Sequence, residues 1–115
     1  MSKQPKEKLK GELSGSEIEK LKAAHPGLKS IIFTNYDTLE KGVVYIKKIP
    51  RAVYETALQI SEKKSRVTVG EYLLTNLRVG GMEAKEIVDD IYWLGEFSAH
   101  AETLIFVHTG EIKKN

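Results

Sequence analysis

The sequence predicts one α+β domain, in which a β-hairpin packs against three or four helices and the C-terminal helix is the longest. Two runs of β-prone residues, 28–35 and 43–48, are separated by a turn-rich segment. Apolar residues recur at helical spacing on both sides of this pair. A chain of 115 residues, 41% of them apolar, is long enough to bury one core.

The two strands are expected to pair in an antiparallel manner. The first run contains Ile31, Ile32 and Phe33, and the second alternates, with Val44 and Ile46 on one face. Residues 37–42 are rich in turn formers, so the loop between the strands is predicted to hold six or seven residues.

Three shorter helices are expected from their start and stop signals. Ser16 and Glu19 fit a capping box for the first helix, which Pro26 and Gly27 end. The second helix begins at Pro50 and is followed by a charged loop over 62–66. A third helix is predicted from a capping box at 68–71 to the glycine pair at 80–81.

One long helix is predicted over residues 83–107. Apolar side chains recur there at steps of three and four, namely Ile87, Ile91, Leu94, Ala101 and Ile105. The segment contains no proline, and Gly95 is its one glycine. The helix is also acidic, with six acidic residues and one basic residue between positions 83 and 104.

The ends of the chain differ in composition from the middle. Residues 1–13 are predicted to form a flexible basic tail, 14–110 the domain and 111–115 a polar C-terminal tail. The sequence has no cysteine, which excludes disulfides and thiolate metal sites. It shows neither an apolar leader nor a run of membrane-spanning length, so a cytoplasmic protein without membrane contact is expected.

No motif for catalysis is present. Gly80-Gly81 lacks the spacing of a phosphate loop, and Asp89 and Asp90 point about 100° apart on a helix. Glu96 and His100 have the spacing of two zinc ligands, but no third ligand is near in sequence. We therefore expect a protein that is not an enzyme, with no cofactor and no metal.

A second apolar strip on the long helix predicts a partner-binding site. It consists of Tyr92, Trp93, Phe97 and Phe106, with Tyr54 and Tyr72 as neighbours. Such a strip indicates either deep burial in the core or contact with a partner chain, including a second copy of the protein.

Basic residues within the fold offer another function, weak nucleic-acid binding. The candidates are Lys47, Lys48, Arg51, Lys63 and Lys64. The net charge of +2 is small and the acidic helix would repel a phosphate backbone, so strong nucleic-acid binding is not expected.

Several short features follow one another between residues 16 and 105. After the opening helix and the strand pair come Lys47-Lys48-x-Pro50-Arg51, then Gly70-Glu71-x-Leu73-Leu74-x-Asn76, Val79-Gly80-Gly81 and Asp89-Asp90. This succession resembles small proteins of bacteriophage and prophage morphogenesis, of the tail assembly chaperone type. Residues 62–69 (EKKSRVTV) depart from the short acidic, proline-bearing link of that family.

The resemblance implies a non-catalytic assembly factor that binds the long tape-measure protein while a phage tail tube is built. It implies no catalytic or ligand-binding residues. The alternatives are a small structural virion protein or oligomer subunit, for which a homo-oligomer is expected, and the nucleic-acid-binding protein described above.

Overall fold

The computed structural model describes residues 8–105. In chain order, its elements are α1 (Gly15–Ala24), β1 (Lys29–Thr34), β2 (Lys41–Ile46), α2 (Arg51–Lys63), α3 (Arg66–Leu77), β3 (Arg78–Gly81), α4 (Ala84–Val88), α5 (Ile91–Ala101) and the 3-10 turn η1 (Glu102–Leu104). The α+β class and the hairpin are confirmed.

The sheet has three antiparallel strands in the order β1-β2-β3. Ile31 lies opposite Val44 in the hairpin, and residues 35–40 form its loop. The third strand was not predicted: Arg78–Gly81 had been assigned to the end of a helix and a turn, but Gly80 lies opposite Tyr45 and extends the sheet.

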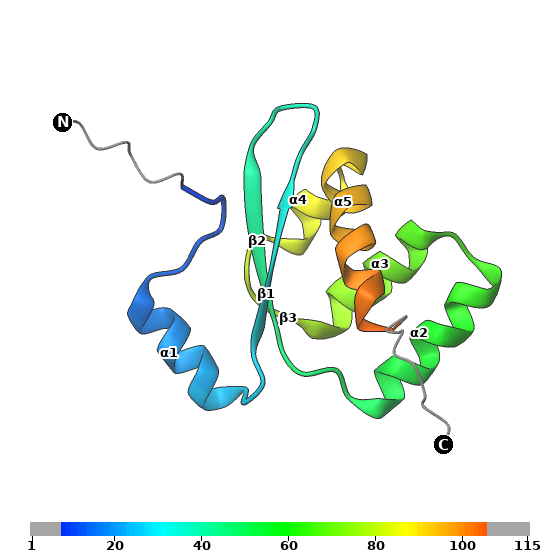
Figure 1. Cartoon of the computed structure of the whole chain (residues 1–115), viewed down its shortest axis with the longest axis horizontal. Coiled ribbons are helices and arrows are strands. Elements are labelled where there is room, and N and C mark those ends of the chain that lie inside the picture. Colours follow the sequence, from blue (N-terminus) through cyan, green and yellow to red (C-terminus); the bar gives the residue numbers. More distant parts are fainter. Residues whose placement is uncertain (1–7, 106–115) are drawn as a thin grey trace, which may run out of the picture.

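The two faces of the sheet are covered differently (Figure 1). Val44 and Ile46 belong to the main core, on the face of the sheet that α5 covers. Helix α3 packs against α5, and α2 packs against α3. Val43 and Tyr45 point to the opposite face, where α1 lies. Both side chains are buried, although α1 itself has no buried residue.

Aromatic rings join the hairpin to α5. The ring of Phe33 makes edge-to-face contacts with Trp93 and Phe97, at centroid distances of 5.4 and 5.6 Å. Such pairs add roughly 0.5–1.5 kcal/mol beyond the burial of their area. The hairpin and α5 are therefore held in a fixed relation, which matters for the surface at their common end.

Residues 8–13, called the N-terminal strap below, lie along the edge of β2 beyond the end of β3. The amide of Lys10 donates to the carbonyl of Lys41 at 2.9 Å, and the amide of Val43 donates to the carbonyl of Lys10 at 3.0 Å. Gly11 has a φ of +86°, and a Cβ there would lie 2.4 Å from the amide nitrogen of Met82. This part of the expected flexible tail is thus paired, while residues 1–7 lie outside the described part.

Helix starts differ from the prediction by a few residues. Ser14 and Glu17, rather than Ser16 and Glu19, form the capping box of α1. Ser65 caps α3 and accepts a hydrogen bond from the amide of Thr68, so that helix begins before the predicted 68–71 box. Each serine offers a hydroxyl to the free amides of a first turn, and sequence spacing alone did not choose between them.

The prediction of one helix over 83–107 is wrong. The chain leaves the helical conformation at Asp90, whose φ of −130° and ψ of 113° are extended, and α4 and α5 are separate helices. Gly95, the one glycine of the predicted segment, lies inside α5 without a break. Positions 106 and 107 lie outside the described residues. None of the helices described is long and apolar enough to cross a bilayer.

Candidate protein-binding surface

Two residues of the predicted partner site belong to the core. Trp93 is 3% exposed and Phe97 is 1% exposed, and both contact Phe33 across the sheet interface. Both side chains are therefore core residues in the folded monomer, where neither is accessible to a partner. The strip that they form faces the sheet rather than the solvent.

The remaining residues of that prediction have different positions. Tyr92 is 50% exposed at the start of α5. Tyr54 and Tyr72 pack at the border of the core, and the Tyr54 hydroxyl donates to the carbonyl of Ile105 at 3.4 Å. Phe106 lies outside the described residues. Of the predicted site, Tyr92 alone is shown to be accessible.

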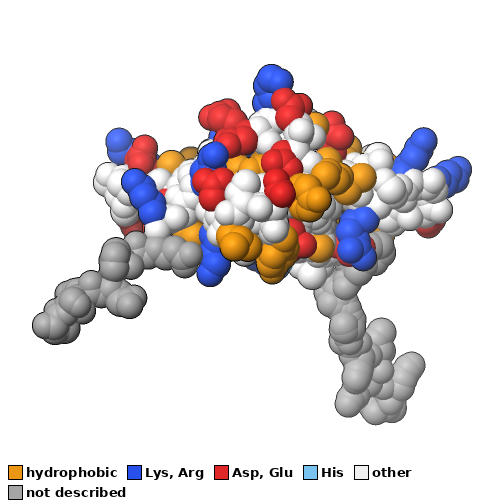
Figure 2. Space-filling model, turned by 90° about the horizontal axis from the view of Figure 1, so that it is seen from above, with side chains coloured by type: hydrophobic (Ala, Val, Ile, Leu, Met, Phe, Trp, Pro, Cys, Tyr) orange, Lys and Arg blue, Asp and Glu red, His pale blue; other side chains and the backbone are white. Residues whose placement is uncertain are grey.

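Exposed hydrophobic side chains gather at one end of the molecule. Among residues 8–105, the large hydrophobic side chains with the greatest exposure are Ile32 (49%), Tyr36 (64%), Leu39 (72%), Ile91 (59%) and Tyr92 (50%). All of these except Ile32 come from the hairpin loop or the first turn of α5, which lie at the same end. Figure 2 looks onto this end and shows hydrophobic side chains beside acidic ones. We call Tyr36, Leu39, Ile91 and Tyr92 the tip surface.

Asn35 shapes the half of the tip surface that comes from the hairpin loop. Its side chain is fully buried, and its Oδ1 accepts hydrogen bonds from the amides of Asp37 and Thr38 at 2.8 and 3.1 Å. Leu39 has a φ of +67°, a left-handed conformation that is uncommon outside glycine. The loop is therefore held in one shape that projects Leu39 outward.

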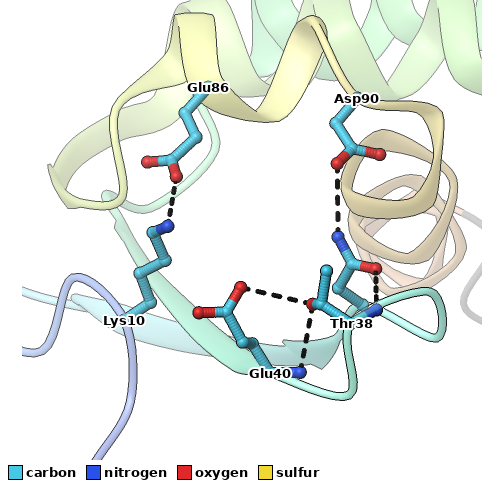
Figure 3. Close-up of polar contacts among 6 residues, drawn as sticks. Lys10, Thr38, Glu40, Glu86 and Asp90 are labelled. Carbon is cyan, nitrogen blue, oxygen red and sulfur yellow. Dashed lines mark hydrogen bonds and ion pairs between the residues drawn. The ribbon is translucent and has the colours of Figure 1, made fainter.

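Asp90 joins that loop to the start of α5. One carboxylate oxygen accepts from the amide of Tyr92 at 2.9 Å as the helix N-cap, and the other accepts from Asn35 Nδ2 at 3.4 Å. Figure 3 shows this contact between the loop and the corner that separates α4 from α5. The same carboxylate that ends the predicted long helix thus places Ile91 and Tyr92 beside the hairpin loop.

Lysines neutralise part of the acidic helix face. Lys10 Nζ lies 2.5 Å from Glu86, and Lys85 Nζ lies 2.7 Å from Asp89. The hydrogen bond to Glu86 raises the pKa of Lys10 above its ordinary value, and the hydrogen bond to Asp89 does the same for the pKa of Lys85. Glu86 and Asp89 are thus paired with lysines, and the negative charge near the tip surface comes mainly from the hairpin loop and Asp90.

The hairpin loop contributes residues that sequence reasoning missed. Tyr36 and Leu39 follow no helix or strand periodicity, so a search for apolar stripes passed over them. The signal that was available was simpler: two large hydrophobic residues stand in a segment of turn formers, where burial is not expected.

The basic clusters do not form one patch. Lys47, Lys48 and Arg51 lie at the start of α2, while Lys63 and Lys64 lie at its end, about 20 Å away at ~1.5 Å per residue. Arg51 is also paired with Glu55 at 2.7 Å. As for metals, residues 8–105 contain no group of three or more histidine or carboxylate side chains placed to hold an ion.

Comparisons with protein-family models, with curated proteins and with solved structures find no match for this chain.

Proposed function

We propose that this protein is a non-catalytic binding module that receives a partner protein on the tip surface. The observation that carries the proposal is the gathering of Tyr36, Leu39, Ile91 and Tyr92, each at least half exposed, at one end of the molecule. Exposed clusters of large apolar groups usually mark binding sites, and aromatic residues are enriched in protein interfaces.

The construction of the surface supports this proposal. Asn35 and Asp90 hold the loop and the helix start together, so little order has to be gained when a partner binds. A preformed surface of this kind loses less conformational entropy on association than a mobile one. The capping and packing around it are those of a stable fold, and yet four large side chains remain in solvent.

Charge indicates which partner fits. Asp37, Glu40 and Asp90 lie on the same loop and helix start as the apolar groups. A partner that presents apolar anchors flanked by lysine or arginine would match both the apolar side chains and the negative charge of this surface. For a tail assembly chaperone, the family that the sequence resembles, that partner would be a segment of a long helical tape-measure protein. If a neighbouring gene encodes such a protein, its product is the natural ligand to test.

The test is a selection for binders followed by mapping. A yeast-displayed peptide library is sorted against the wild-type protein, and the peptides obtained are titrated against Ile91→Lys, Tyr92→Ala and Ile32→Lys. We expect peptides with apolar anchors and basic flanks. We expect Tyr92→Ala to weaken their binding by about thirtyfold, as for an anchor contributing about 2 kcal/mol.

Ile32→Lys is the matched control, because it adds the same charge at a site of similar exposure away from the tip surface. Peptides whose affinity is unchanged by Ile91→Lys and Tyr92→Ala would place binding elsewhere and remove the proposal.

A further inference from the structure

The outer edge of β1 carries unpaired backbone groups. The β1–β2 register and the amide of Asn35, which donates to the carbonyl of Glu40, make Lys29, Ile31 and Phe33 the residues whose backbone faces β2. The N–H and C=O groups of Ser30, Ile32 and Thr34 therefore point outward. Within residues 8–105, no backbone hydrogen bond is made to them from that side.

This edge lacks the usual protection. Exposed edge strands are normally blunted by proline, a bulge or a central charge. β1 has no proline, its pairing with β2 is regular, and its one charge, Lys29, stands at the start. Ile32, at the middle of the outward-facing set, is 49% exposed.

Open grooves flank the edge on both faces of the sheet. On the α1 side, a groove of about 340 Å³ lies between Ile32 and the helix residues Ile18 and Lys22. On the α5 side, one of about 290 Å³ lies between the strand and His100 and Leu104. A strand added to β1 would point alternate side chains into the two grooves, which is how strand addition gains specificity.

The charges differ between the two ends of this edge. The end where β1 starts is basic, with Lys22, Lys29, Lys47 and Lys48 close to the strand ends. The hairpin-loop end is acidic, with Asp37, Glu40, Glu86, Asp89 and Asp90 against Lys10, Lys41 and Lys85. An antiparallel second copy would bring each basic end against an acidic one.

We propose that β1 is a homodimer interface, in which the β1 strands of two copies pair in an antiparallel manner about a twofold axis at Ile32. In this register Ser30 of one copy lies opposite Thr34 of the other, and Ile32 lies opposite Ile32, so every outward N–H and C=O is paired. Lys29 then lies beside the 35–40 loop of the second copy. The result is one continuous six-stranded sheet.

Sedimentation equilibrium from micromolar to millimolar protein tests the interface. We expect wild type to dimerise, more strongly at low salt than at high salt because opposite ends attract. Ile32→Lys places two ammonium groups side by side at the axis and weakens dimerisation by about tenfold or more. Ile91→Lys adds the same charge away from the axis, so its effect on dimerisation is expected to be much smaller. A wild type that is monomeric throughout, or a dimer weakened by Ile91→Lys and not by Ile32→Lys, overturns the proposal.

Cross-linking tests the register independently, since the sequence has no cysteine to interfere. At the axis the two Cα atoms lie about 5.5 Å apart, so Ile32→Cys is expected to form a covalent dimer with a short thiol-specific cross-linker. Ser30→Cys alone does not, because its two copies are about 14 Å apart along the strands. A mixture of Ser30→Cys and Thr34→Cys forms the mixed dimer. Cross-linking of Ser30→Cys with itself, or failure of Ile32→Cys, rules out this pairing.

Discussion

Replacing Gly70 by alanine sets two effects of opposite sign against each other. In an exposed helix, alanine is more favourable than glycine by about 1 kcal/mol. At position 70, however, a Cβ would lie 1.8 Å from Ser98 Oγ, 2.5 Å from Ser98 Cβ and 2.9 Å from Ser98 Cα. The last of these is backbone, so a side-chain rotation cannot relieve the contact and α3 has to move away from α5.

We expect Gly70→Ala to be destabilising overall. Overpacking of a close-packed core costs about 1–3 kcal/mol, and the backbone contact puts this site in the upper part of that range, above the gain in helix propensity. Each kcal/mol lost lowers Tm by about 4–8 °C in a small domain. Thermal unfolding followed by circular dichroism measures the change.

Gly95→Ala is the matched control, because position 95 is also inside a helix but a Cβ there meets nothing within 4 Å. That variant is expected to gain up to about 1 kcal/mol. Ser98→Gly removes the two nearest contacts of Gly70→Ala, and Ser98 Oγ has no hydrogen-bond partner in the described structure. A double-mutant cycle therefore shows a favourable coupling. If Gly70→Ala raises Tm as Gly95→Ala does, the close crossing of α3 and α5 is refuted.

Two further predictions concern α5 and α1. Trp93→Ala, in the core rather than on the surface, is expected to cost about 3–5 kcal/mol in urea unfolding, and a variant as stable as wild type would contradict its burial. Hydrogen bonds from the amide and hydroxyl of Ser14 lower the pKa of Glu17 from its ordinary value of 4.5. The capping box therefore stabilises α1 at pH values above 4.5, and this stabilisation is lost as the pH falls through the lowered pKa. The Ser14 amide shift in NMR should report this midpoint below 4.5 in wild type, and Glu17→Gln should abolish the step; a midpoint at or above 4.5 would contradict it.

The sequence predicted those elements whose causes are local. Both hairpin strands consist of β-prone residues, and α2 follows Pro50 as expected. The third strand could not be found this way. Arg78–Gly81 has two glycines among four residues and little intrinsic β preference, and it is a strand because it pairs with β2.

The break between α4 and α5 also depends on a distant residue. Asp89 and Asp90 fit a helical pattern, with neither glycine nor proline to mark an end. Asp90 leaves the helix because its carboxylate caps α5 and accepts a hydrogen bond from Asn35, 55 residues earlier. Single-residue preferences contain no information about such a contact.

The candidate surface was predicted in part for a related reason. Adjacent positions on α5 have opposite environments: Tyr92 is half exposed and Trp93 is buried. The sequence showed that the helix has more apolar groups than one stripe requires, but the direction of the sheet decides which of them face solvent. Tyr36 and Leu39 join Tyr92 through the fold alone.

The N-terminal strap has a consequence for the order of events during synthesis. Its residues leave the ribosome before any others described here, yet its partners lie on β2, at Met82 and at Glu86. Until α4 has emerged, Lys10 has no Glu86 to bind, and the edge of β2 has only part of its final cover. Chains grow at about 5–20 residues per second, so several seconds pass between synthesis of the strap and synthesis of the segment that holds it. A segment made before its partners is thus among the last to be fixed.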